Sequence, residues 1–312
     1  MQNSMKALKS SLILLLCSLS WFSGVTHAQS SANGSLTIVG SDTLSRLMTD
    51  WTETFYTKHP EIAVEIQAVG SAAAPPALQQ GTANIGTMSR AMNQDERTAF
   101  LALRGFDPTE IALAEDAVVF ITHPSNPMDA ISDEMVARIF GMPGTCGTSG
   151  RVSRWSHLDP EHAFGAKAIQ VFGRTATSGT YQYFRRAALC DGDPGVFINE
   201  VPGSSGVVNT IARLPYGLAY SPATHAESGV KVLNIIMRDG TVVSPTDKNY
   251  PFKRVLYMYT ATALEVSKDS PECQFIKFIA TPAGLLSLRT AGFRIPSEGQ
   301  GLTIREAADA CG

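Results

Sequence analysis

The chain has 312 residues, of which 44% are hydrophobic, and its 25 basic and 28 acidic side chains give a formal net charge of −3. This charge argues against a nucleic-acid partner, because no surplus of basic side chains is available to neutralise backbone phosphates. The length is large for a single hydrophobic core, so we expect two domains.

The first 28 residues have the pattern of a secretory signal peptide. Two lysines precede the apolar run 12–17, and residues 26–28 are typical of a cleavage site. The apolar run is too short to cross a membrane. Cys17 follows Leu16, which is larger than the residue that usually precedes a lipidated cysteine. We therefore expect cleavage after Ala28 and a periplasmic protein, and the loss of two lysines lowers the net charge from −3 to −5.

Four cysteines follow the signal peptide, namely Cys146, Cys190, Cys273 and Cys311. An even number in an exported protein favours two disulfides, and four cysteines allow three pairings. Pairing between sequence neighbours, Cys146 with Cys190 and Cys273 with Cys311, would keep each bridge within one local region. The alternative is a metal site, but neither a CxxC motif nor a histidine pair at ligand spacing accompanies the cysteines. We expect no metal and no cofactor.

Two strand-to-helix junctions follow in the first part of the exported chain. The first joins a strand at 36–39 to an amphipathic helix that begins near Leu44 and stops at Pro60. The second joins an alternating strand at 64–69 to a helix with two prolines in its first turn, for which Ser71 is a reasonable N-cap. Each junction is a short polar loop.

A third junction is a strand at 84–88 that runs into the polar turn Ser89-Arg90, before a capped helix that starts at Asn93. Strands and helices that alternate in this order predict an α/β fold with a parallel sheet. The loops then gather at the carboxyl edge of the sheet, where such folds bind their ligands.

The rest of the chain continues this alternation. Residues 112–122 predict a strand that Glu115 and Asp116 interrupt, before a helix at 132–140. Residues 203–206, Gly-Ser-Ser-Gly, precede a helix and are interpreted as ordinary capping, with a role in ligand binding as the less favoured alternative. Further strands are predicted at 217–220, 230–237 and 255–260, and helices at 271–280 and 281–290.

One later junction combines charge, hydroxyls and glycine. A strand at 168–172 leads to Arg174, and Ser178, Gly179 and Thr180 then precede a helix-like stretch. The free N–H groups of a first helical turn, two hydroxyls and a guanidinium are typical of an anion-binding loop. Glycine lets the chain approach a ligand closely.

Four junctions that carry Ser, Thr and Gly together indicate a tetrahedral oxyanion held mainly by N–H and O–H dipoles. An enzyme is disfavoured, because a hydrolase that used Ser178 would need a base that these loops do not offer. The sequence also lacks a G-x-S-x-G elbow and a Walker-type phosphate loop. The histidines of the exported chain lie outside these loops, at His59, His123, His157, His162 and His225.

The order of the motifs resembles the phosphate-binding proteins of bacterial ABC importers, the PstS-like branch of the periplasmic binding proteins. The matching motifs are Gly40-Ser41-Asp42-Thr43-Leu44, Gly70-Ser71, Ile85-Gly86-Thr87-Met88-Ser89-Arg90, and Arg174 followed by Ser178-Gly179-Thr180. The resemblance implies two α/β lobes, each a mostly parallel sheet flanked by helices, joined by crossover strands. Lobe one is expected at 33–117 and 258–312, and lobe two at 118–257. One disulfide would then lie in each lobe.

The resemblance also implies the roles of the site residues. Thr43 would donate its hydroxyl, Leu44 its backbone N–H, and Ser71 a hydrogen bond from the second helix start. Arg174 would neutralise charge from the other lobe. The full phosphate-binding set is expected to be Asp42, Thr43, Leu44, Ser71, Ser89, Arg174, Ser178, Gly179 and Thr180.

Two positions depart from the pattern of the resembled family. Ser89 stands where many members have an aspartate that accepts the proton of monohydrogen phosphate. Ala176 stands where a second acid is common, so we expect Arg174 to lack an internal acidic partner and to direct its charge to the ligand. Asp42 is the nearby carboxylate that could accept the proton instead, and we state this role as a hypothesis.

The function that we expect is a monomeric, non-enzymatic receptor. It would bind inorganic phosphate in an interlobe cleft and deliver it to the membrane permease and ATPase of an ABC importer. The alternatives are the same fold with sulfate, molybdate, tungstate or phosphonate as its ligand, and an exported phosphatase.

Overall fold

The computed structural model describes residues 34–227, 229–264 and 268–312, and these belong to one compact unit. The predicted signal peptide lies outside the described residues. Strands and helices alternate along most of the chain in a two-lobed α/β fold, as predicted. Within the described ranges, every helix is too short or too polar to cross a membrane.

The first group of strands contains the predicted parallel sheet. β1 (Gly34–Gly40) pairs in parallel with β2 (Ile62–Gln67) and with β3 (Ile85–Met88). β11 (Lys253–Thr260) pairs antiparallel with β3, and the short β12 (Leu302–Thr303) pairs in parallel with β4 (Thr109–Thr122). The loops after β1 and β3 therefore leave the sheet at the same edge, as alternation predicts.

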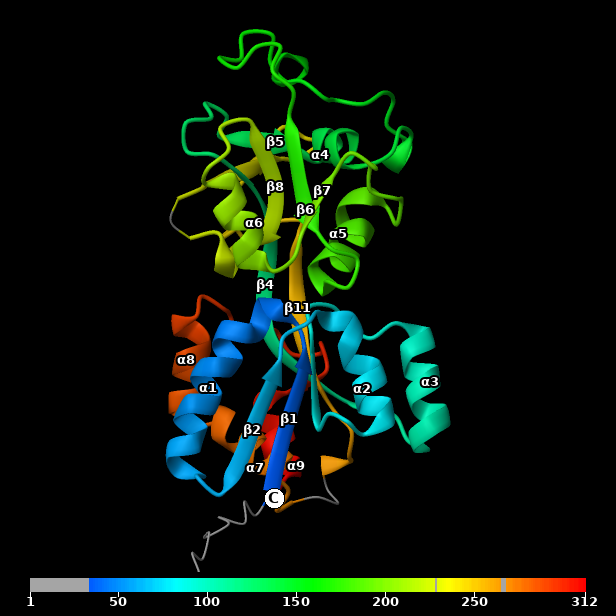
Figure 1. Cartoon of the computed structure of the whole chain (residues 1–312), viewed down its shortest axis with the longest axis vertical. Helices are drawn as coiled ribbons and strands as arrows, with labels where there is room; N and C mark the ends of the chain where they lie inside the picture. The colour runs from blue at the N-terminus through cyan, green and yellow to red at the C-terminus, as the bar shows by residue number, and fades with distance from the viewer. Residues whose placement is uncertain (1–33, 228, 265–267) are drawn as a thin grey trace, which may run out of the picture. The chain divides into compact units, whose positions relative to one another are not determined.

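The second group of strands is connected to the first through β4 (Thr109–Thr122). β4 pairs antiparallel with β11 along its first part and with β8 (Gly217–Pro222) along its last part. β6 (Gln170–Arg174) lies between β8 and β7 (Asn199–Val201) and is parallel to both. Figure 1 shows β4 and β11 running side by side. The remaining strands are β5 (Ala130–Ser132), β9 (Lys231–Ile236) and β10 (Val242–Val243).

The strand predicted at 112–122 is confirmed as part of β4, which runs through Glu115 and Asp116, so these two residues interrupt its apolar pattern but not the strand itself. Asp116 lies directly opposite Arg254 of β11 in the ladder, and the two side chains form an ion pair. A carboxylate can remain inside a sheet when its partner lies across the ladder. That partner is 138 residues away in the sequence, so local periodicity does not reveal it.

The helices follow the predicted starts closely. In α1 (Ser45–Lys58) the residues Leu47, Met48, Trp51 and Phe55 are buried, as the apolar spacing predicts. Ser132 and Asn93 cap their helices as expected. Ser71 does not cap, because Gly70 precedes the three-residue turn Ser71–Ala73 and the Ser71 hydroxyl bonds elsewhere. The other helices are α2 (Ala74–Gln80), α3 (Gln94–Arg104), α4 (Asp133–Phe140), α5 (Gly179–Leu189), α6 (Ser204–Ile211), α7 (Pro271–Ile279), α8 (Pro282–Thr290) and α9 (Ile304–Ala310).

Buried apolar side chains form separate clusters around the two groups of strands. One cluster draws on residues between Ala117 and Phe252, including the stacked rings of Phe184 and Tyr220. Another draws on β1, α1 and the C-terminal helices, with Trp51 among its fully buried members. The polar loops after β1, β3 and β6 are therefore attached to strands whose apolar side chains belong to these clusters. The predicted lobe boundaries stay a prediction.

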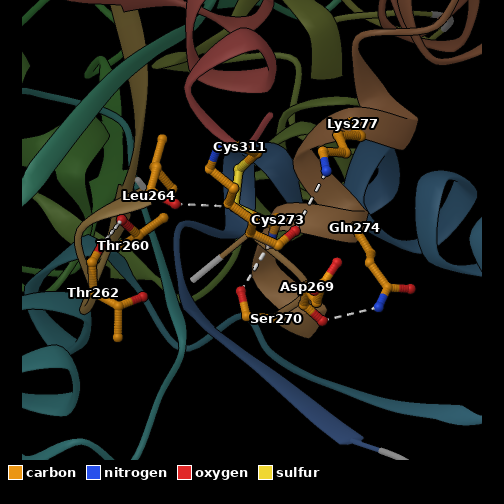
Figure 2. The surroundings of a disulfide bond; sticks show 10 residues. Thr260, Thr262, Leu264, Asp269, Ser270, Cys273, Gln274, Lys277 and Cys311 are labelled. Atoms are coloured by element: carbon orange, nitrogen blue, oxygen red, sulfur yellow. Dashed lines mark hydrogen bonds between the residues drawn. A yellow bond between two sulfur atoms is a disulfide. The ribbon is translucent and has the colours of Figure 1, made fainter. Parts of the chain in front are cut away.

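Each disulfide joins two cysteines that follow one another in the order of cysteines along the exported chain, as predicted. Cys146 is bonded to Cys190 and Cys273 to Cys311, with Cα–Cα distances of 5.4 Å in each case. Cys273 and Cys311 are completely buried, whereas Cys190 is exposed. Figure 2 shows the Cys273–Cys311 bridge at the start of α7, where Cys273 N–H donates to Ser270 Oγ at 3.2 Å.

Reduction of the two bridges is expected to lower stability without changing the fold. They close loops of 44 and 38 residues. Loops of this size restrict the unfolded chain by roughly 3–4 kcal/mol each on the chain-entropy model, or roughly 10 °C of melting temperature. Thermal unfolding of native protein, of reduced and alkylated protein, and of a Cys146→Ser/Cys190→Ser variant measures the effect. Four reactive thiols in the native protein would contradict the bridges.

Candidate functional site

The polar loops that follow β1, β2 and β3 lie against one another, and we call them the N-terminal loops (residues 40–44, 70–73 and 89–90). Gly70 N–H donates to Gly40 O at 2.8 Å, and Ser41 N–H donates to Thr87 O at 2.8 Å. The hydroxyls of Ser41 and Ser89 are hydrogen-bonded to each other. Three loops that are distant in the sequence thus form one polar surface.

A fourth segment lies directly against this surface, and we call it the arginine loop (residues 174–180). Ala72 N–H donates to Thr177 O at 3.1 Å. The hydroxyls of Thr43 and Thr180 lie 3.1 Å apart, and both side chains are buried. The structure therefore brings together residues of all four predicted junctions.

Gly179 is the point of closest approach between the arginine loop and the N-terminal loops. A Cβ at this position would lie 2.8 Å from Ser71 Cβ and 3.0 Å from Ser89 Cβ. It would come still closer to Ser71 Oγ. Gly179 does not adopt a positive φ, so glycine is required here by the lack of space and not by the backbone conformation.

The hydroxyls of Ser71 and Ser178 both accept hydrogen bonds from backbone N–H groups. Ser89 N–H donates to Ser71 Oγ at 2.9 Å. Ser178 is the N-cap of α5, and its Oγ accepts from Thr180 N–H at 3.1 Å and Tyr181 N–H at 3.4 Å. A hydroxyl that accepts in this way keeps its own hydrogen to donate. Leu44 ends the turn Asp42–Leu44, and its side chain is fully buried in the core.

The expectation that Arg174 lacks an acidic partner is wrong. Its Nη2 forms an ion pair with Asp42 Oδ1, and its Nη1 donates to Ser204 Oγ. The Arg174 side chain is only 3% exposed, so the pair lies in a poorly solvated place where charge-assisted bonds are strong. The acidic partner comes from the N-terminal loops, 132 residues away, and not from position 176, where this chain has an alanine.

Ser204 is also not the ordinary cap that the sequence indicates. It is the first residue of α6, and no side chain caps that helix. Its hydroxyl accepts from Arg174, and its N–H donates to Asp42 Oδ2 at 2.7 Å. Both carboxylate oxygens of Asp42 therefore accept hydrogen bonds already, one from Arg174 and one from Ser204.

His225 is a further residue that the sequence did not place here. Its Nε2 lies 3.2 Å from Thr43 O, and its Nδ1 lies 3.3 Å from Ser205 Oγ. Burial lowers the pKa of His225, while the bond to the Thr43 carbonyl and the charge of Asp42 act in the opposite direction. The neutral ring then donates from Nε2 to Thr43 O and accepts from Ser205 at Nδ1. It thereby fixes the backbone of the first N-terminal loop.

Two arginines complete the surroundings of the site. Arg90 forms an ion pair with Glu96 at 2.6 Å, and its Nε donates to Gln182 Oε1 on α5. Arg254 donates to Thr180 Oγ1 at 3.0 Å. Arg90 stands in a predicted turn and could have been proposed from the sequence, whereas Arg254 lies inside a strand and carries no local signal. Within the described ranges, no cluster of three or more His, Cys, Asp or Glu side chains could hold a metal ion.

Comparisons with known proteins agree with this architecture. A family model described as a PBP superfamily domain matches residues 25–282. The phosphate-binding protein PstS of Pseudomonas aeruginosa is 38% identical over 261 residues, which are 82% of this chain and 81% of that protein.

Two solved structures have a similar fold. One is a putative phosphate ABC transporter substrate-binding protein with bound phosphate from Clostridium perfringens, with a TM-score of 0.67 and 22% identity over 83% of this chain and 98% of that one. The other is an ABC-type phosphate transport receptor from Vibrio cholerae, with a TM-score of 0.61 and 20% identity over 84% and 100% of the two chains. The family match and the PstS relative together show that the chain belongs to the PBP superfamily and, within it, to the PstS-like proteins.

Proposed function

We propose that this chain is a periplasmic substrate-binding protein that captures inorganic phosphate between its lobes and delivers it to the permease and ATPase of an ABC importer. The observation that carries the proposal is the convergence of hydroxyls, the α5 N-terminus and Arg174 from four separate loops. The PstS relative from Pseudomonas aeruginosa is named for phosphate binding, and the Clostridium perfringens structure contains bound phosphate.

The chemistry of the site suits a tetrahedral oxyanion. Hydroxyls of Thr43, Ser71 and Thr180 can donate hydrogen bonds, and the N-terminus of α5, which Ser178 caps, presents the positive end of a helix dipole. Arg174 adds a cation that is almost fully buried. Donors come from the N-terminal loops and from the arginine loop, so the anion is fully bonded only when the two are together. Binding is thereby coupled to closure of the lobes.

The proton of monohydrogen phosphate needs an acceptor, and the hydroxyl pair of Ser41 and Ser89 can supply one. Either oxygen of this pair can donate or accept. We propose that this pair replaces the aspartate of other family members, and that Asp42 serves to hold Arg174 in place.

Replacing Asp42 by asparagine tests this assignment. Both carboxylate oxygens are already occupied by Arg174 and Ser204, so we expect phosphate and sulfate affinities to fall together. The loss of a partly buried charged bond is expected to weaken both by about 1–2 kcal/mol. Calorimetric titration with each anion measures their ratio, and Asp50→Asn, an exposed carboxylate of α1, is the control. A selective gain in sulfate affinity would instead identify Asp42 as the proton acceptor.

The proposed function is tested by calorimetric titration of purified, ligand-stripped protein with phosphate, sulfate and molybdate, together with a turnover assay on a phosphomonoester. We expect saturable phosphate binding, weaker binding of the other anions and no turnover. Absence of phosphate binding overturns the proposal. Tighter binding of sulfate or molybdate would assign the same fold to another oxyanion.

A further inference from the structure

A buried arginine outside the predicted set touches both halves of the proposed site. Arg254 lies on β11 opposite Asp116 of β4, and the two side chains are 1% and 0% exposed. Its Nε and Nη2 donate to Asp116 Oδ2 at 3.2 Å and 2.7 Å. Two of the three guanidinium nitrogens are thus used to neutralise a carboxylate that would otherwise be buried unpaired.

The third nitrogen of Arg254 connects the two sides of the site. Nη1 donates to Thr180 Oγ1 at 3.0 Å and lies 3.3 Å from Ser89 O. Ser89 belongs to the N-terminal loops, and Thr180 belongs to the arginine loop. The guanidinium of Arg254, which lies on β11 and is paired with Asp116 of β4, therefore contacts one residue of each loop group.

The bond to Thr180 has a direction. An arginine nitrogen only donates, so the Thr180 hydroxyl must accept from it with a lone pair. The single hydrogen of that hydroxyl then points away from Arg254, toward Thr43 Oγ1 at 3.1 Å or toward a bound oxyanion. When Thr180 donates to Thr43, the hydrogen of Thr43 is in turn available to the ligand.

We propose that Arg254 is a positioning residue of the phosphate site, which orients the hydroxyl of Thr180 as a donor and thereby raises affinity for the anion. This inference rests on the proposed function. Asp116 lies on the opposite end of the guanidinium from Thr180, so the ion pair presents its cationic end to the site. Arg254 thus adds a hydrogen-bond donor to the site while Asp116 balances its charge.

Tyr183 of α5 also lies next to Arg254, but it does not compete with Thr180 for the hydrogen bond from the guanidinium. The Tyr183 ring lies 5.6 Å from the guanidinium carbon, and burial raises the pKa of Tyr183 to about 12. Tyr183 is therefore protonated, and its hydroxyl donates to Lys253 O at 2.5 Å. It supplies a ring face and not a negative charge, so Thr180 keeps its bond to Arg254.

If Arg254 only formed a structural ion pair with Asp116, its replacement would change phosphate affinity equally whichever residue stands at position 180. If it positions the Thr180 hydroxyl, the change depends on Thr180, so a double-mutant cycle distinguishes the two roles. The first arm is Arg254→Met with Asp116→Asn, which removes the donor and leaves no unpaired charge. The second arm is Arg254→Lys, which retains a charge for Asp116 but has one nitrogen in place of three. Each arm is made in the wild type and in Thr180→Val, and phosphate affinity is measured by calorimetry.

We expect the Arg254→Met/Asp116→Asn change to weaken phosphate binding about tenfold in the wild type and less than about twofold in Thr180→Val. Arg254→Lys should give a smaller loss that also disappears in Thr180→Val. Equal losses in the two backgrounds, or wild-type affinity in either arm, overturn the positioning role. If the double replacement does not fold, Arg254→Lys alone decides. A wild-type protein that does not bind phosphate overturns both this inference and the proposed function, whereas equal losses overturn this inference alone.

Discussion

Replacing Arg174 by alanine is expected to weaken phosphate binding by about 2 kcal/mol or more, roughly 30-fold. The guanidinium is 3% exposed and lies between Asp42 and Ser204, where solvent screens its charge little. Its removal takes away the cation of the proposed site and leaves the carboxylate of Asp42 facing the anion. Repulsion from Asp42 then adds to the loss of the charge-assisted bond. Calorimetric titration with phosphate measures the change.

Arg46→Ala is the matched control for this experiment. Arg46 also pairs with an acid that is distant in the sequence, Glu227 at 3.1 Å, but both side chains are 61% exposed. Exposed ion pairs contribute less than about 1 kcal/mol, so phosphate affinity should stay close to that of the wild type. Wild-type affinity in Arg174→Ala would contradict the placement of Arg174 in the site. Equal losses in the two variants would point to a general effect of ion pairs between residues that are distant in the sequence.

The features predicted correctly from the sequence have local signals. The apolar spacing at Leu47, Trp51 and Phe55 specifies the buried face of α1, because it depends only on the helical repeat. The loop after β6 was recognised because Arg174, glycine and hydroxyls stand close together in the chain. Each of these patterns is complete within about a dozen residues, so a single sequence suffices to recognise it.

The features that were missed depend on partners far apart in the chain. Arg174 meets Asp42 across 132 positions, and Arg254 meets Asp116 across 138. No spacing rule connects such residues, because their contact follows from how β4, β11 and the loops pair in space. The capping role predicted for the serines at 203–206 fails at Ser204 because its partner, Arg174, is likewise distant in the sequence. A serine before a helix is normally a cap, and only the approach of Arg174 gives its hydroxyl another partner.

Placing a methyl group at Gly179 is expected to weaken phosphate binding by about 2–3 kcal/mol, roughly 30- to 150-fold, with little change in folding. The added Cβ would lie within 3.0 Å of Ser89 Cβ and closer still to Ser71. The arginine loop would have to move away from the N-terminal loops, which separates Thr180 from Thr43. Donors from the two sides could then no longer reach one anion together. Titration with phosphate and thermal unfolding measure the two effects.

The folding part of this prediction follows from where Gly179 stands. It is the first residue of α5 and has no positive φ, so alanine fits the helix at least as well as glycine. Gly206→Ala is the matched control, because Gly206 is also near a helix start but its Cβ would meet only Val201 Cγ1, at 3.1 Å. That variant should bind phosphate like the wild type. If Gly179→Ala binds phosphate and melts like the wild type, close approach of the two loop groups is not required for binding. The proposed coupling of phosphate binding to closure of the lobes would then be wrong.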